Sequence, residues 1–484
     1  MSDGKMAVSV FSFGGKIMQS EDYLGNERMY KLILKFSIPC ILSLLISALY
    51  NIVDQIFIGN SSVGSIGNTA TTIVFPLTTI ALAFGLMLGD GCAAYMSLCQ
   101  GRGEKEKTGK AVGTAFLFSI IFSALFYVIC FPLLDQILTF FGAQTAESLE
   151  KAHEYGFIIV IGFPFYIIMN TLNSIIRADG SPKIAMISMV AGAITNVILD
   201  ALMILVWNLG LTGAALATII GQGVSFVISF CYLFKTKTFK LHLKDVIPSW
   251  EAVKEIFKLG FSSFLTQICV VVISIVSMNM IAIYGAKSKY GINDPQAIVG
   301  VVMKIFAIVV NIVVGIAAGA QPVIGYNYGA KKFDRVRKGF WIVILSTLVV
   351  GIIATILFQS IPRQLVGIFG ANTAEPDLYF EFGEYTIRIY LMFIVFTCLQ
   401  KVCSIFLQSI SSPLKATILS LIRDVICFVP FTICLPISMG ILGVLWAAPI
   451  SDAISIVCTF VLVSLEFRKM KKEELSYKDS TTQA

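Results

Sequence analysis

Long runs of apolar residues recur along almost the whole chain and are separated by short polar segments. A helix needs about 20 apolar residues to cross a bilayer core of ~30 Å. The alternating segments of about ten residues that are typical of an outer-membrane barrel do not occur. The pattern therefore predicts an all-α polytopic membrane protein with twelve transmembrane helices. Their apolar runs begin near residues 32, 68, 111, 154, 183, 211, 254, 297, 339, 384, 413 and 441.

The composition excludes most soluble classes of protein. Hydrophobic residues make up 57% of the 484 residues and charged residues 13%, roughly half of the ~25% that soluble domains carry. The net charge of +7 comes from loop lysines and arginines, so we expect no nucleic-acid partner. The two histidines, His153 and His242, lie too far apart to suggest a metal site. The eleven cysteines fall in or beside apolar runs and are expected to be small core residues.

The loop charges predict an orientation in the membrane. Alternate connections, counted from the N-terminus, hold 26 lysines and arginines on one side and four on the other. Cytoplasmic loops carry the excess of positive charge, so both termini are predicted to be cytoplasmic. The first ~28 residues lack an apolar core followed by a cleavage site, and we expect no cleavable signal peptide.

The chain also repeats itself. FGAQTAE at 141–147 matches FGANTAE at 369–375 in six of seven positions, at an offset of 228 residues. An even number of spans in each half gives both halves the same orientation, so the repeats are parallel. Such a duplication favours a transporter whose substrate path lies between the halves, although channels can also be duplicated. Further matched positions are Gly101 with Gly329, Ser181–Pro182 with Ser412–Pro413, and Lys35 with Lys258.

The repeat divides the chain into five predicted parts. The N-lobe is expected over 31–235 and the C-lobe over 254–467, with a central V-shaped cleft between the two. A cytoplasmic segment at 1–30, a cytoplasmic linker at 236–253 and a cytoplasmic tail at 468–484 complete the chain. The polar end of this tail, 473–484, is predicted to be disordered.

Four polar residues of the first half are predicted to lie at one depth. Asp54 and Asp200 sit ~7–11 Å below the outer surface at 1.5 Å per residue. Asn196 is one turn from Asp200, and Thr218 reaches the same level from the next span. Carboxylate, amide and hydroxyl oxygens suit a hard cation or protons. The second half lacks this set, with Ser277 at the position of Asp54, which favours a function of the N-lobe over simple bonding between helices.

Other polar positions leave more than one interpretation open. Asn170, Asn173 and Arg177 share one helix face, where they would line a substrate cavity or bond neighbouring helices. Pro39 removes a backbone hydrogen bond from the first span, so it is a candidate hinge or a static kink.

A second group of charges lies in the spans of the C-lobe. Arg423 and Asp424 are neighbours in sequence and should point to different helix faces, so each is expected to need its own partner. A structural charge network is the favoured interpretation. The plausible partners are Lys304, Lys401 and Asp452.

An ordered set of motifs, together with the repeat, resembles the MATE family of multidrug and toxic compound extrusion transporters. The resemblance covers about 30–465. It rests on LYNIVDQIFIG at 49–59, QGRGEKEKTG at 100–109, NSIIRADGSPK at 173–183 and TNVILDALMI at 195–204. Helices 7 and 10 contain no carboxylate in their interiors, which resembles the DinF-type branch rather than the NorM-type branch.

The resemblance implies a specific function for these residues. Family members export cationic or amphipathic organic compounds by antiport with Na⁺ or H⁺, and alternating access is the expected mechanism. Asp54, Asn196, Asp200 and Thr218 match the cation site of the family. Tyr155, Asn170 and Asn173 match polar residues linked to proton coupling and substrate contact, and Pro39 matches the bending proline.

The expected protein is a monomer in the cytoplasmic membrane of a prokaryote and is not an enzyme. It needs no cofactor beyond the coupling ion, and its partners are small organic cations and the lipid bilayer. Three rivals remain: a flippase for lipid-linked saccharides, a channel and a membrane-embedded enzyme. A flippase would be expected to have a cationic cavity for pyrophosphate, which the acidic cluster opposes. No selectivity-filter sequence, HExxH or GxSxG supports the other two.

Overall fold

The computed structural model describes residues 20–59, 61, 64–143, 145–240, 242–291, 293–368 and 376–482. Every regular element within these ranges is a helix. Eleven helices are long and apolar enough to cross a membrane, and a pair of helices bent by 47° supplies a twelfth span. This confirms the predicted all-α fold with twelve spans. The second repeat motif, at 369–375, lies outside the described residues.

The spans follow one another without large insertions. The first six are α2 (Met29–Gly59), α3 (Gly64–Arg102), α4 (Lys105–Cys130), α6 (Ala146–Ala178), α7 (Pro182–Asp200) with η1 (Ala201–Val206), and α8 (Gly210–Tyr232). The next six are α9 (Trp250–Gly285), α10 (Asn293–Gly329), α11 (Phe333–Ser360), α13 (Pro376–Tyr390) with α14 (Ile394–Ser409), α15 (Pro413–Leu421) with η4 (Ile422–Cys427) and α16 (Phe428–Met439), and α17 (Ile441–Thr482). Shorter helices are α1 (Ser20–Asn26), α5 (Leu134–Phe140), η2 (Leu233–Lys235), η3 (Leu243–Val246) and α12 (Pro362–Gly367).

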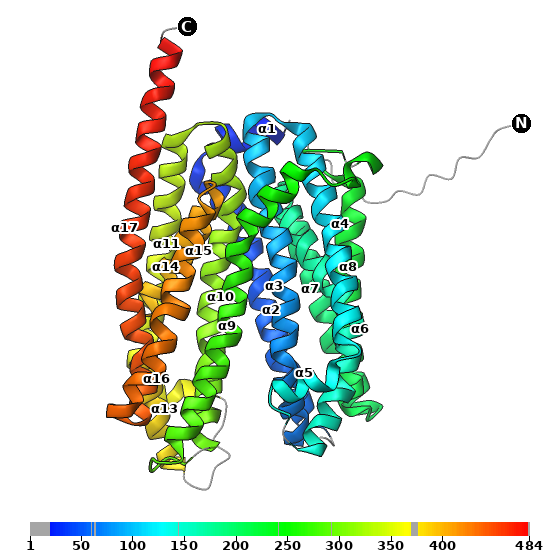
Figure 1. Ribbon diagram of the computed structural model, residues 1–484, viewed down its shortest axis with the longest axis vertical. Coiled ribbons are helices and arrows are strands. Elements are labelled where there is room, and N and C mark those ends of the chain that lie inside the picture. Colours follow the sequence, from blue (N-terminus) through cyan, green and yellow to red (C-terminus); the bar gives the residue numbers. More distant parts are fainter. Residues whose placement is uncertain are drawn as a thin grey trace, which may run out of the picture.

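The two ends of the bundle differ in charge. We call the end where α2 begins and α3 ends the basic end, because it holds those of the 26 lysines and arginines counted above that lie within the described residues. It is uppermost in Figure 1, where α1 and the end of α17 also lie. The opposite end, where α5 lies, is called the far end.

The repeat is visible in the backbone of the turns. The turn between α3 and α4 places Gly103 at φ 77° and Glu104 at φ −86°, ψ 65°. At the same offset of 228 residues, Lys331 has φ 55° and Lys332 has φ −85°, ψ 62°. The short helices α5 and α12 begin at residues 134 and 362, again 228 apart. The two halves thus share local geometry where their sequences differ.

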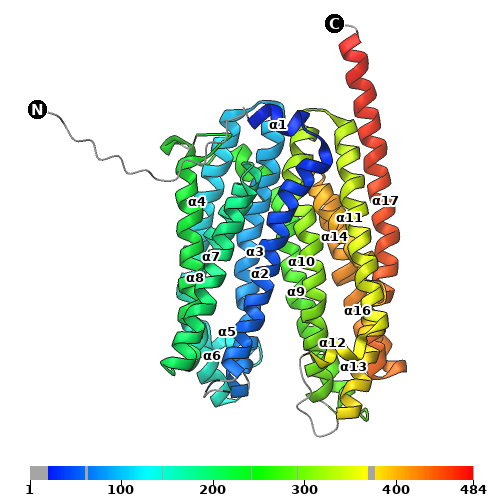
Figure 2. The ribbon, with the colours of Figure 1, turned by 180° about the vertical axis from the view of Figure 1, so that it is seen from behind.

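The lobes meet along a seam in the basic half of the bundle. Helix α3 packs along α9, and α10 packs along α2 and α3. A Cβ atom at Gly260 of α9 would lie 1.8 Å from the carbonyl oxygen of Met87 in α3, and one at Gly319 of α10 would lie 2.5 Å from the Cα of Ser37 in α2. Only glycine permits these approaches. Toward the far end the lobes diverge in both views (Figures 1 and 2).

The tail differs from its prediction. The helix of the last span continues to Thr482, so the predicted disorder of 473–484 is wrong over the described part of the tail. Side-chain contacts account for the helix. Lys469 pairs with Glu473 one turn later at 3.7 Å, and Glu474 binds Arg337 of α11 at 2.7 Å. A polar composition alone does not reveal ion pairs within the helix or with α11, and these ion pairs stabilise the helical tail.

Most of the cysteines follow their prediction. All eleven are free thiols, and eight of them are buried. Cys231 and Cys434 are exposed on the outside of the bundle, so the prediction of a core position is wrong for these two. Because a thiol is only weakly polar, a lipid-facing position suits it as well as a buried one.

Candidate functional site

Two intramembrane carboxyl groups meet near the far end of the first lobe. Asp54 lies five residues before the end of α2, and Asp200 is the last residue of α7. Both are buried, and their carboxyl groups are close enough for a proton on one to form a hydrogen bond to the other. The π-helical turn η1 follows Asp200 directly and is closed by a 2.9 Å bond from Trp207 N to the Leu202 carbonyl. Such turns are frequent at functional sites.

The neighbouring helices complete the group at the same depth. Asn196, one turn before Asp200, donates a 3.4 Å hydrogen bond from its Nδ2 to the hydroxyl of Thr218 in α8. Tyr155 of α6 is also buried and faces Asp54, Asp200 and Thr218. Five of the predicted residues are therefore brought together, from four helices.

Four oxygens of this group find no hydrogen-bond donor in the described part of the protein. Asp54 Oδ1, Asn196 Oδ1 and both carboxyl oxygens of Asp200 are buried and accept no hydrogen bond within the described chain. Buried carboxylates are costly unless a proton, a cation or a donor compensates their charge. The donor set contains oxygen only, and no cluster of three His, Cys, Asp or Glu with metal-binding geometry occurs among the described residues. The residues present fit a hard monovalent cation or protons.

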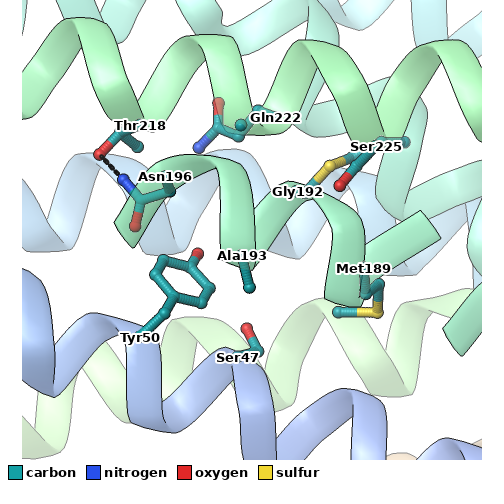
Figure 3. Close-up of a pocket in the computed structure, with 11 residues that line it drawn as sticks. Ser47, Tyr50, Met189, Gly192, Ala193, Asn196, Thr218, Gln222 and Ser225 are labelled. Atoms are coloured by element: carbon teal, nitrogen blue, oxygen red, sulfur yellow. Dashed lines mark hydrogen bonds between the residues drawn. The ribbon is translucent and has the colours of Figure 1, made fainter. Parts of the chain in front are cut away.

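A small cavity adjoins the group on its basic side (Figure 3). Its volume of about 30 Å³ suffices for one or two water-sized species. A drug-sized ligand needs about 300–1,000 Å³, so this cavity suits an ion or water rather than an organic substrate. Asn196 and Thr218 line it, so it opens onto the predicted cation ligands. The remaining lining residues include Ser47, Tyr50, Met189, Gln222 and Ser225.

Sequence reasoning missed these polar lining residues, although a signal for them exists. Ser47 and Tyr50 precede Asp54 by seven and four residues, which places all three on one face of α2. Gln222 and Ser225 follow Thr218 by four and seven residues on α8 in the same way. Helical spacing from the predicted ligands would have found them.

Two predicted residues lie elsewhere. Asn170 and Asn173 stand 15 and 18 residues beyond Tyr155 on α6, which is roughly 22–27 Å at 1.5 Å per residue. Asn170 donates a 2.8 Å bond to the carbonyl of Tyr166. Asn173 is buried, and neither amide atom has a hydrogen-bond partner among the described residues. The structure therefore separates both asparagines from the acidic group and places them in the basic half.

Arg177, the third member of that helix face, belongs to a contact between the lobes. It donates 2.8 Å to the hydroxyl of Ser174 and lies 3.6 Å from Asp90 of α3. Ser174 and Ser263 of α9 both donate to Asp90, at 2.8 and 3.0 Å. Asp90 was absent from the predicted intramembrane charges, although a lone acid in a long apolar helix is itself a signal.

The second lobe holds a balanced charge network. Asp424 accepts from Lys401 at 2.9 Å and from Arg423 at 2.8 Å, while Arg423 also binds Asp452 at 3.0 Å. Lys401 and Asp452 are confirmed as partners. The expectation that Arg423 and Asp424 point apart is wrong, because the long Arg423 side chain folds back within the π-helical turn η4. Two cations and two anions compensate each other, so this network needs no ligand.

Pro39 lies inside the continuous helix α2 and is buried. Its neighbours Ser37 and Ile41 pack against Gly319 and Gly315 of α10. The proline is therefore part of the seam between the lobes, about 22 Å along the helix from Asp54.

Comparisons with known proteins agree on the family. The family model for MatE matches residues 39–202 and 263–459. The multidrug export protein MepA of Staphylococcus aureus (strain MSSA476) is 26% identical over 446 residues, which cover 92% of this chain and 95% of that protein. The MepA protein of Staphylococcus saprophyticus is 25% identical over 446 residues, which again cover 92% of this chain and 95% of that protein.

Solved structures show the same fold. A MATE protein in complex with MaL6 superposes with a TM-score of 0.85 at 22% identity, over 93% of this chain and 98% of that one. An outward-facing multidrug resistance MATE transporter of the MOP superfamily also superposes with a TM-score of 0.85. It is 23% identical, over 93% of this chain and 98% of that one. With the family model matched over both halves, the chain belongs to the MatE family, whose members are membrane transporters and not enzymes.

Proposed function

We propose that this protein is a secondary multidrug efflux transporter, which exports cationic or amphipathic organic compounds in exchange for Na⁺ or H⁺. The names of the MepA relatives support the substrate class. The flippase alternative gains no support from these relatives. We expect the protein to act as a monomer and to need no cofactor besides the coupling ion.

The single observation that carries the coupling proposal is the unsatisfied acid pair. Asp54 and Asp200 are both buried in the first lobe, next to a cavity of the size of an ion. The matching positions of the second lobe carry no acid pair. In the other lobe, the four charges of the network around Arg423 and Asp424 are already paired with one another. Two adjacent carboxylates repel each other and readily take up a proton or a cation.

The mechanism follows from charge competition at this pair. Ion-free, Asp54 and Asp200 attract an organic cation. Uptake of Na⁺ or of protons from the outside neutralises them and weakens their hold on the drug, which leaves outward. When the lobes reopen toward the cytoplasm, the ion departs and the acids regain their charge. Tyr155 and Thr218 hold the pair in a polar environment during both steps.

For transport, ion binding at the acid pair must alter the packing of the two lobes at the seam. Asp54 and Pro39 share α2, and Pro39 sits where this helix packs on α10. A proline lowers the cost of bending because it lacks one helix hydrogen bond. We therefore propose Pro39 as the hinge through which ion binding alters the contact between the lobes.

Charge supports an orientation for this cycle. We propose that the basic end is cytoplasmic, with both termini, because positive loops remain inside. The acid pair then lies on the outer side, where it meets the driving ion. We also assign the protein to the DinF-type branch, because α14 contains no carboxylate and the acids of α9 and α13 lie in the first third of their spans.

The test is transport of ethidium in proteoliposomes under an imposed Na⁺ gradient or an imposed pH gradient. We expect one gradient to drive ethidium movement in the wild-type protein and the Asp200→Asn variant to lose it. Asp377→Asn, at an exposed acid outside the cluster, serves as the matched control and should keep the wild-type rate.

Two outcomes would contradict the proposal. Wild-type rates in Asp54→Asn or Asp200→Asn would remove the acid pair from the coupling mechanism. Failure of every imposed gradient to move any organic cation with the wild-type protein would remove the multidrug function itself.

A further inference from the structure

A large basic pocket lies at the basic end between the first and the ninth span. Its volume is about 680 Å³, far larger than the cavity beside the acid pair. One wall is the start of α2, from the first lobe, and the other is the first three turns of α11, from the second lobe. Its lining residues are Asn26, Arg28, Met29, Tyr30, Asp334, Arg335, Arg337, Lys338, Trp341 and Ile342.

The cations that line the pocket differ in whether a carboxylate of the protein already compensates their charge. Arg337 is paired with Asp334 and Glu474, both at 2.7 Å, so its charge is compensated. Arg335 donates to three uncharged oxygens, at 2.7 to 3.2 Å. It therefore keeps its positive charge while its side chain is held rigid. Arg335 supplies a fixed cation at the pocket.

Arg28 and Lys338 supply two further cations. Both side chains are exposed, and neither makes an ion pair within the described part of the chain. The nearby carboxylate of Glu27 accepts from the backbone nitrogen of Arg28 at 2.9 Å. With four cations and one anion among its lining residues, the pocket has a net positive charge. It is suited to a group that carries negative charge, and a phosphate ester is the usual partner of such clusters.

The pocket continues into an apolar surface that faces the membrane. On α2, Tyr30, Leu34 and Ile38 follow one another at four-residue spacing and are 46, 54 and 50% exposed. On α11, Trp341 and Leu345 form a parallel row and are 64 and 62% exposed. Each row begins with an aromatic residue at the pocket, the position that aromatic side chains prefer at the boundary between lipid and water.

We propose that this pocket binds the phosphate headgroup of an anionic phospholipid, with the acyl chains lying along the apolar rows of α2 and α11. Charge at the head and apolar surface below it match the two parts of such a lipid. A free phosphate would use only the upper part of the site. The assignment to the cytoplasmic leaflet rests on the orientation proposed above, whereas the site itself does not.

The bound headgroup would bridge the two lobes. Arg28 and Tyr30 belong to the first lobe, while Lys338 and Trp341 belong to the second. The two walls touch at the base of the pocket, where a Cβ atom at Gly339 would lie 2.8 Å from the Cε of Met29. A lipid in this position therefore favours the state in which the lobes are joined at the basic end.

The test is binding of phosphatidylglycerol to the full-length protein in neutral detergent, measured by native mass spectrometry and by thermal stability. We expect phosphatidylglycerol to bind and to raise the melting temperature, and phosphatidylcholine to do neither. The double variant Arg28→Gln/Lys338→Gln should bind phosphatidylglycerol about 30-fold more weakly. The charge-preserving variant Arg28→Lys/Lys338→Arg should retain most of the affinity, which separates loss of charge from loss of fold.

The control removes the same amount of charge elsewhere at the same end. Lys110→Gln/Lys183→Gln lies on α4 and α7, away from the pocket, and should bind as the wild type does. Equal loss in this control, or full binding in Arg28→Gln/Lys338→Gln, would overturn the proposal. If inorganic phosphate alone reproduced the stabilisation, the site would be one for a free anion and the lipid assignment would fail.

Discussion

Gly91 of α3 and Gly260 of α9 face each other across the seam, so that a Cβ atom at Gly91 would lie 2.9 Å from the backbone nitrogen of Gly260. The repeat places Gly319 of α10 at the position of Gly91, and Ser37 of α2 at that of Gly260. These two also meet across the seam. Both lobes thus contribute the same contact, and the seam inherits the symmetry of the duplication.

A larger residue at Gly260 should force the seam open. The added Cβ would approach the Met87 carbonyl to 1.8 Å, a contact that only a backbone shift can relieve. We expect Gly260→Val to lower stability by about 1–3 kcal/mol and to make Met87→Cys reactive to a hydrophilic maleimide from the basic end. The measurements are melting temperature and labelling rate. Gly300→Ala, where nothing lies within 4 Å of the new Cβ, should change neither. Labelling that stays slow in Gly260→Val would contradict the conclusion that close packing at Gly260 keeps the seam shut.

The charge network of the second lobe should be required for stability rather than for coupling. Asp424 is the only carboxylate that contacts both Lys401 and Arg423 in the described residues. Asp424→Asn therefore leaves an uncompensated buried charge, and the expected loss of stability is about 3–5 kcal/mol. Lys401→Met should cost less, because Asp424 keeps its pair with Arg423. Denaturation in mixed detergent micelles measures both losses, and equal losses in the two variants would argue against the network as drawn.

Much of the fold and half of the candidate site could be predicted because depth in a membrane can be counted along a helix. Asp54, Asp200 and Thr218 were placed at one level by rise per residue alone, and α2, α7 and α8 bring them together. The same count, applied to Asn170 and Asn173, would have placed them far from this level. They were grouped with Tyr155 by family resemblance, which carries residue identity but no distance.

Contacts between lobes could not be predicted in this way. The pairing of Asp90 with Ser263 depends on which faces of α3 and α9 meet, and one sequence does not fix the rotation of a helix. The fold-back of Arg423 onto Asp424 depends on a π-helical turn whose residues carry no recognisable signal. The helical tail was missed because polar composition indicates disorder unless partners on another helix, such as Arg337, are known.

The linker between the lobes should detach when one buried acid is removed. Asp179, at the end of α6, is fully buried and accepts from Tyr232 Oη at 2.5 Å and from the backbone nitrogens of Lys237 and Thr238 at 2.8 and 2.9 Å. Hydrogen bonds to a charged group contribute about 1.5–3 kcal/mol each. Asp179→Ala should therefore free the linker.

Limited trypsin digestion measures this change, because the linker carries lysines at Lys237, Lys240 and Lys244. We expect Asp179→Ala to be cleaved there several-fold faster than the wild type. The exposed Asp377→Ala should be cleaved at the wild-type rate. Unchanged cleavage in Asp179→Ala would mean that the other contacts of the linker suffice to hold it on the first lobe.

The effect of Thr218→Ala should depend on the ion that drives transport. The Thr218 hydroxyl accepts from Asn196 and has an oxygen that can contribute to a Na⁺ site, but it does not exchange a proton near neutral pH. If Na⁺ is the coupling ion, Thr218→Ala should raise the Na⁺ concentration for half-maximal transport by about tenfold, which corresponds to about 1.4 kcal/mol for one lost ligand. If protons drive transport, the variant should keep the wild-type pH dependence. Asp200→Asn should abolish transport in both cases, because Na⁺ and protons both need its charge. A Thr218→Ala variant that loses transport under every gradient would instead give this residue a structural role and remove it from the ion site.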